Sequence, residues 1–204
     1  MDMNKPWTKL NPTPPFVLES DRQIIDGYNS NPRTCKNHKI QTELYPEPFL
    51  GKPNVNVILL NLNPGFSDDD AEFHQRNDYF IEQARKNLTH QSDYGFYLLD
   101  PRINKSPGYN WWSKRLRTLI EACGQKNVAQ NIFCIEFFPY HSTNFKKIET
   151  LESQKYSFQL INKAIKRNAI VILMRGRRPW IKSVPHLETY SRCFLLKNPR
   201  CAYI

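Results

Sequence analysis

The chain has 204 residues, a formal net charge of +10 and a pI of about 9.4. A hydrophobic content of 40% and an aromatic content of 13% exclude a disordered chain, which would carry fewer such residues. No apolar run approaches the roughly 18 residues of a membrane span, and the first residues lack the apolar core of a signal peptide. We expect a globular, cytoplasmic, monomeric protein with no membrane partner. The basic excess favours a polyanion partner, nucleic acid first.

The cysteines predict neither a metal centre nor a disulfide framework. There are five, an odd number, and none forms the Cys-x-x-Cys pair that is typical of zinc and iron–sulfur sites. We interpret them as reduced thiols and expect no metal and no organic cofactor.

Residues 1–54 are rich in proline and poor in periodicity, which indicates an arm that wraps the domain rather than a unit of its own. One short helix is expected at 19–29, with Ser20 as its cap. Ile24, Ile25 and Tyr28 would form the apolar face of that helix.

A buried strand is expected at 55–62, where an almost continuous apolar run ends abruptly at Asn63-Pro64-Gly65. Ser67 and the three aspartates after it predict a helix start, because a hydroxyl cap and carboxylates suit the positive end of a helix. We expect this helix to reach about Lys86.

The rest of the chain alternates between helices and strands. We expect a loop at 87–109, helices at 111–123, 148–167 and 180–183, and strands at 131–138, 169–174 and 194–196. Such alternation predicts an α/β fold, a three-layer sandwich in which helices cover both faces of a central, mainly parallel four-stranded sheet. The domain would span 55–204.

Four turns are expected to meet at one edge of this sheet, because the carboxyl ends of parallel strands converge on the rim where ligands bind. They cover residues 63–66, 139–142, 175–178 and 198–200. They carry polar side chains that can contact a base or a phosphate.

These turns carry a family resemblance. The Leu-Asn-Pro-Gly run at 62–65 resembles the first motif of the uracil-DNA glycosylase superfamily, most closely the mismatch-specific uracil/thymine branch. Asn198-Pro199-Arg200 stands where the second family motif follows the last strand. Between them, the Trp-Trp pair at 111–112 resembles an aromatic helix of the family, and 171–176 resembles its penultimate strand. The resemblance covers about residues 55–204, with all elements in order.

The resemblance implies a DNA glycosylase that flips a damaged or mismatched base out of DNA and hydrolyses its N-glycosidic bond. Asn63 would orient the attacking water, and His141, as an acid or base near neutral pH, is the second catalytic candidate. Substrate contacts would come from Pro64, Gly65, Phe66, Tyr140, Ser142, Asn198, Pro199 and Arg200. Arg175, Arg177 and Arg178 would contact DNA phosphates.

Several of these residues also have a simpler interpretation, which the sequence leaves open. Asn63 would serve only as a turn former, Phe66 as core, His141 as a surface histidine and the arginines as a solvated loop. The Trp-Trp pair at 111–112 is expected in the core. The alternative function is a non-catalytic nucleic-acid-binding protein on the same scaffold, and a different small-molecule hydrolase or nucleotide-binding domain ranks third.

Overall fold

A computed structural model describes residues 5–196, 198 and 203–204. Its centre is a five-stranded mixed sheet in the order β1-β3-β2-β4-β5. The strands are β1 (Phe49–Leu50), β2 (Val57–Asn61), β3 (Ile132–Glu136), β4 (Ile170–Leu173) and β5 (Cys193–Leu195). Four of them run parallel, and β1 pairs antiparallel with β3. The fold is therefore α/β as expected, but the sheet has one strand more than predicted.

The extra strand comes from the proline-rich arm. Phe49 and Leu50 pair with Ile135 and Cys134 at the edge of the sheet. Two residues between a proline and a glycine are too short to show a periodicity of two, so the sequence pattern predicted no strand there.

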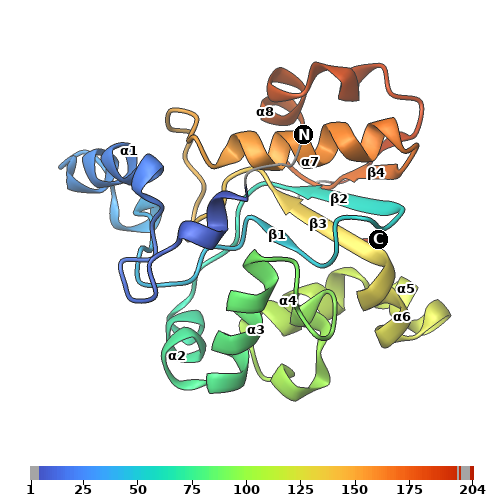
Figure 1. The fold of residues 1–204 in the computed structure, drawn as a ribbon, viewed down its shortest axis with the longest axis horizontal. Coiled ribbons are helices and arrows are strands. Elements are labelled where there is room, and N and C mark those ends of the chain that lie inside the picture. Colours follow the sequence, from blue (N-terminus) through green and yellow to red (C-terminus); the bar gives the residue numbers. More distant parts are fainter. Residues whose placement is uncertain (1–4, 197, 199–202) are drawn as a thin grey trace.

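Helices cover both faces of the sheet (Figure 1). On one face lie α7 (Gln154–Lys166) and α8 (Arg177–Ser183), and the other face carries α3 (Asp78–Leu88), α4 (Pro107–Arg115), α5 (Arg117–Cys123) and α6 (Gln125–Asn131). At one end of the sheet lie α1 (Glu19–Ser30) and α2 (Asp68–Arg76). None of the helices in the described part of the chain is long and apolar enough to cross a membrane.

Several predicted helices are confirmed with changed boundaries. The helix after Ser67 is broken into α2 and α3 at Asn77, whose side chain accepts from the amide of Phe80 and so caps the second helix. The helix around the Trp-Trp pair begins earlier, at Pro107 behind the Ser106 cap, and α6 was not predicted. The cap of α1 is Leu18 rather than Ser20. The described residues also form short 3-10 helices at Pro6–Lys9, Lys36–His38, Tyr97–Leu99, Pro101–Ile103 and Pro185–Glu188.

The arm and the sheet share one hydrophobic core. Trp7, Phe16 and Val17 from the arm are buried together with the central strands and the inner face of α7. The Tyr140 hydroxyl accepts from the Leu18 amide and donates to Asp21, and so ties the arm to the segment after β3. The arm is therefore held against the carboxyl edge of the sheet, where it also supplies Glu47 to the cavity described next.

Candidate active site

A cavity of about 310 Å³ opens at the carboxyl ends of β2 and β3. Its size lies at the lower end of the roughly 300–1,000 Å³ range of small-molecule sites. Aromatic side chains form much of its wall: Phe66 from the turn after β2, Phe80 from α3, and Trp111 and Trp112 from α4. The cavity therefore lies where the topology of a parallel sheet places ligands.

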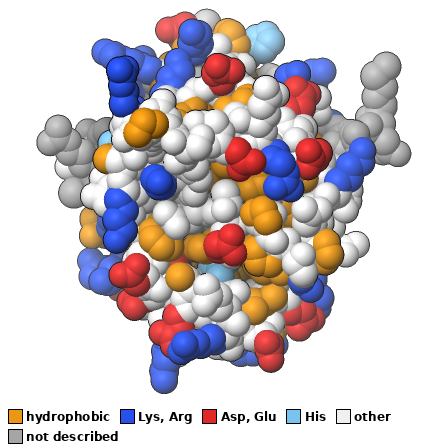
Figure 2. All heavy atoms as spheres, turned by 90° about the vertical axis from the view of Figure 1, so that its left-hand side faces the viewer, with side chains coloured by type: hydrophobic (Ala, Val, Ile, Leu, Met, Phe, Trp, Pro, Cys, Tyr) orange, Lys and Arg blue, Asp and Glu red, His pale blue; other side chains and the backbone are white. Residues whose placement is uncertain are grey.

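Figure 2 shows the face of the molecule toward which the carboxyl ends of the parallel strands point. Hydrophobic side chains gather in the lower middle of this face, and charged side chains of both signs are distributed around them. This face does not carry one uniform basic surface, although the chain as a whole is strongly basic.

Asn63 is held in a single orientation at the cavity wall. Its Nδ2 donates to the carbonyl oxygen of Pro64 at 2.8 Å, and to the carbonyl oxygen and hydroxyl of Ser142 at 3.3 and 3.1 Å. Two of these partners are carbonyl oxygens that can only accept, so the amide nitrogen must face them. The amide oxygen is therefore on the opposite side of the group, and it is available to accept a hydrogen bond from water or a ligand.

His141 contacts the same turn, residues 63–66, through its imidazole ring. Its Nδ1 lies 2.6 Å from the carbonyl oxygen of Gly65, and its Nε2 lies 3.1 Å from that of Tyr45. The ring is buried, and each of its nitrogens faces a carbonyl oxygen, which can only accept a hydrogen bond. These contacts favour a positioning role for His141, and its catalytic role stays a prediction.

Asn61 and Glu136 form the floor of the cavity. They are the last residues of β2 and β3 and are direct partners in the parallel register. Their side chains therefore meet, and Asn61 Nδ2 donates to Glu136 Oε1 at 3.0 Å. The other two oxygens, Asn61 Oδ1 and Glu136 Oε2, are buried without a hydrogen-bond partner among the described residues. A buried unpaired polar atom costs about 1–3 kcal/mol, so this floor is poised to accept a polar ligand.

Burial raises the pKa of Glu136 from 4.5 to about 8, against the opposing effects of the Asn61 hydrogen bond and the Arg175 charge. The carboxyl group is thus protonated at neutral pH, and Oε2 becomes a hydrogen-bond donor. The floor then offers one donor, on Glu136, and one acceptor, Asn61 Oδ1.

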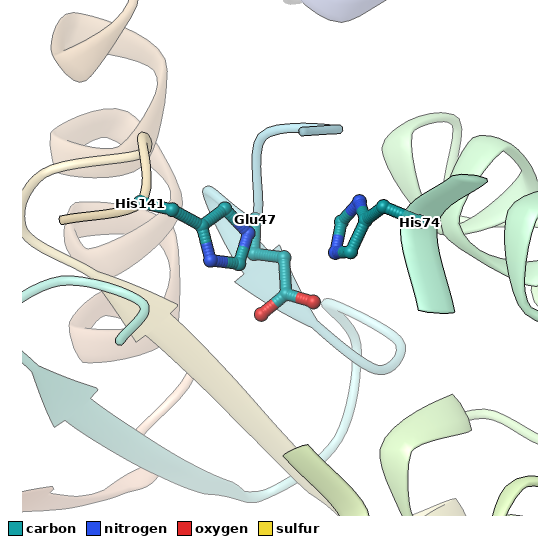
Figure 3. Close-up of side chains that lie close together, drawn as sticks. All are labelled: Glu47, His74 and His141. Atoms are coloured by element: carbon teal, nitrogen blue, oxygen red, sulfur yellow. The ribbon is translucent and has the colours of Figure 1, made fainter. Parts of the chain in front are cut away.

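A second buried cluster joins Glu47, His74 and His141, whose side chains point toward one another (Figure 3). One potential ligand atom from each lies within 4.8 Å of the others, so a metal ion must be considered. The hydrogen bonds do not fit one. His74 Nδ1 accepts from the Tyr45 amide, which leaves hydrogen on Nε2, and both nitrogens of His141 face carbonyl oxygens.

The members of this cluster are instead hydrogen-bonded to Tyr97 and to the backbone. Tyr97 donates to Glu47 Oε1 at 2.7 Å. Burial raises the pKa of Glu47, while the neighbouring His141 acts in the opposite direction. Burial, with His141 beside it, keeps the pKa of His74 well below its usual value, so this ring is neutral.

Seven of the predicted site residues line the cavity: Asn63, Pro64, Gly65, Phe66, His141, Ser142 and Arg175. Tyr140 does not, because its buried hydroxyl is bonded to Asp21 on the arm. Arg177 and Arg178 are exposed at the start of α8, away from the cavity wall. Asn198 is exposed and is not one of the lining residues, while Pro199 and Arg200 lie outside the described residues.

Other lining residues were not predicted. Glu136 interrupts an apolar strand, and a carboxylate in such a run was a usable signal, because glutamate is almost never fully buried without a purpose. Glu47 gave no signal, since it lies in the arm among prolines. Trp111 was expected in the core, but its half-buried ring forms part of the cavity wall.

No protein-family model, curated protein or solved structure matches this chain. The function is therefore inferred from the geometry of the cavity and from the resemblance of its turns.

Proposed function

We propose that this protein is a uracil-DNA glycosylase-like hydrolase that binds a damaged or mismatched base in the cavity and cleaves its N-glycosidic bond. The observation that carries the proposal is the floor formed by Asn61 and Glu136. An acceptor beside a donor suits a base that presents an N–H next to a carbonyl, as uracil, thymine and hypoxanthine do. Such an edge would satisfy both unpaired atoms.

Asn63 would then hold the attacking water. Its amide oxygen accepts a hydrogen bond from that water while its nitrogen remains fixed on Pro64 and Ser142. An amide cannot remove a proton, so Asn63 orients the water and does not activate it. The bond from the sugar carbon to the base nitrogen breaks first, and its electron pair leaves with the base. The water oxygen bonds to the sugar carbon, and the proton that the water loses balances the one that the departing base takes up through solvent.

The cavity walls would stabilise the flipped base and the transition state of bond cleavage. Phe66 and Trp111 offer faces on which the flipped base stacks. Arg175 lines the cavity, and its positive charge would stabilise the negative charge that develops on the leaving base. No covalent enzyme intermediate is required.

Release of free base from oligonucleotides tests the proposal. A panel containing uracil, hypoxanthine and thymine mismatches is incubated with the wild type, Asn63→Ala and Asn162→Ala, the last a control on α7. We expect release from at least one lesion, a loss of about 100-fold in Asn63→Ala because the water is no longer positioned, and wild-type activity in the control. Circular dichroism verifies that each variant is folded.

The alternative is binding without hydrolysis, and a specific observation favours it. Both nitrogens of His141 are held by carbonyl oxygens, so the site offers no free histidine as a base. Absence of release from every lesion, together with retained oligonucleotide binding, would replace the hydrolase by this alternative.

A further inference from the structure

A second hollow, the groove, adjoins the cavity along α4. It encloses about 530 Å³ and shares Pro107 and Trp111 with the cavity wall. The two hollows are therefore neighbours separated by one aromatic side chain. A ligand that enters the cavity with one of its groups can continue over Trp111 into the groove.

Two arginines lie close to this dividing ring. The guanidinium of Arg175, which lines the cavity, is 5.6 Å from the centre of the Trp111 ring, and that of Arg115, which lines the groove, is 5.0 Å from it. The Arg115 guanidinium also lies 4.4 Å from the ring of Tyr203. Alternating aromatic rings and guanidinium groups thus lead from the cavity into the groove.

The groove is basic. Lys105, Lys114 and Arg115 line it, against Asp69 as the single acidic residue among its described lining. The two lysines are exposed, and within the described chain neither side chain forms an ion pair. Arg115 Nε is buried without a hydrogen-bond partner among the described residues. The two lysines are therefore available to bind an anion, and Arg115 carries an N–H that no described residue accepts from.

A backbone hydrogen bond of the following residue holds Tyr203 beside Arg115. The amide of the next residue, Ile204, donates to the carbonyl oxygen of Arg115 at 2.9 Å, while the Tyr203 ring remains 55% exposed. An exposed aromatic ring that rests on a guanidinium group presents a face on which an unpaired base can stack.

We propose that the groove binds single-stranded DNA, with phosphates on Lys105, Lys114 and Arg115 and a neighbouring base on Tyr203. This rests on the proposed function, because the nucleotide next to it would place its base in the cavity. A single strand suits the groove better than a duplex, because stacking on protein rings requires bases that are not already stacked on each other. Alternating cations and aromatic rings are how proteins bind single strands with little sequence preference.

Binding of labelled oligonucleotides by fluorescence anisotropy tests the inference. The wild type is titrated with a single-stranded 12-mer containing uracil and with its duplex, over a range of salt concentrations. The groove variant Lys105→Glu/Lys114→Glu is compared with Lys163→Glu/Lys166→Glu, which makes the same charge change on exposed positions of α7. Tyr203→Ala tests stacking.

We expect the wild type to bind the single strand more tightly than the duplex. The groove variant should lose roughly tenfold or more in affinity, and its salt slope should be shallower by about 1.4, since two phosphate contacts are lost. Tyr203→Ala should lose about 5- to 150-fold for one stacked base. The α7 variant should stay close to the wild type.

Equal losses in the groove and α7 variants would reduce the effect to net charge and overturn the inference, as would preference for the duplex. Base release measured on the same samples separates the two proposals. Groove-dependent binding without release retains the groove and rejects the hydrolase. Release that is faster from duplex and indifferent to the groove variant retains the hydrolase and rejects the groove.

Discussion

Two buried polar clusters line the same cavity and differ in how far their hydrogen bonds are completed. In the closed cluster, Glu47 accepts from Tyr97 and both nitrogens of His141 are occupied by carbonyl oxygens. In the open cluster, Asn61 and Glu136 bond each other once and leave one oxygen each without a partner among the described residues. Both clusters are fully buried, so burial alone does not distinguish them.

This difference in hydrogen bonding indicates which cluster stabilises the fold and which cluster contacts a ligand. A buried group that is hydrogen-bonded within the protein contributes to stability without a ligand. A buried group left unpaired costs free energy until something bonds to it. We therefore infer that the closed cluster holds the turn that carries Asn63, and that the open cluster contacts the ligand.

The largest effect on stability is expected from the closed cluster. His141→Ala leaves the carbonyl oxygens of Gly65 and Tyr45 unpaired and creates a cavity, so the free energy of unfolding should fall by roughly 3 kcal/mol. Tyr97→Phe, which removes only the hydroxyl bonded to Glu47, should cost about 1–3 kcal/mol. Urea denaturation at pH 7 measures both. Stability within roughly 0.5 kcal/mol of the wild type, the scatter that surface substitutions produce, would show that the closed cluster does not hold the fold.

Substitution in the open cluster should instead raise stability, by an amount that grows as the pH rises. The folded state keeps a proton on Glu136 that the unfolded chain loses, since the pKa is raised from 4.5 to about 8. The contribution of this group to the free energy of unfolding therefore declines as the pH rises from about 4.5 to about 8, and it is constant above. Glu136→Gln keeps the shape and removes this titration.

Above pH 8 the Glu136→Gln variant should be more stable than the wild type, by on the order of 1–3 kcal/mol, while near pH 5 the two should agree. The difference between their unfolding free energies across pH 5–9 isolates Glu136 from the other titrating groups. A difference that is independent of pH would mean that Glu136 does not change its protonation on folding.

The smallest effect concerns His90, a partly buried histidine outside both clusters. Burial, with Lys5 nearby, lowers the pKa of His90 to about 4. Stability should therefore decrease as the pH falls from about 6.5 toward 4, because in this range His90 is protonated in the unfolded chain and neutral in the folded protein. An NMR titration of the His90 ring gives the value directly. A measured pKa at or above 6.5 would show that burial does not govern the titration of this ring.

The sequence pattern predicted the edge of the sheet where the cavity lies, but not the polar groups of the cavity floor. The apolar run before residue 63 and the turn after β3 were sufficient to place Asn63, Phe66 and Ser142 at one edge of a parallel sheet. The pairing of Asn61 with Glu136 could not be predicted, because it depends on the register between β2 and β3. Glu47 and the edge strand β1 come from the arm, where no periodic pattern marks either of them.

The contacts of Tyr140 show a second limit of prediction from sequence. A polar residue in a turn at the carboxyl edge can face the cavity or the neighbouring arm, and sequence alone does not distinguish the two. Asp21 settles the matter by accepting from the Tyr140 hydroxyl, a contact between residues 119 positions apart. Predictions for individual turn residues therefore fail where a distant segment supplies the partner.

A crystal structure with a bound substrate analogue tests the central claim most directly. The analogue is a single-stranded oligonucleotide that carries 2′-fluoro-2′-deoxyuridine, whose electron-withdrawing fluorine opposes the oxocarbenium-like transition state and slows cleavage. The account predicts that the uracil lies in the cavity, with its N–H bonded to Asn61 Oδ1, its carbonyl bonded to Glu136 Oε2, and a water on the amide oxygen of Asn63. A uracil bound outside the cavity, or one whose edge does not touch Asn61 and Glu136, would contradict it.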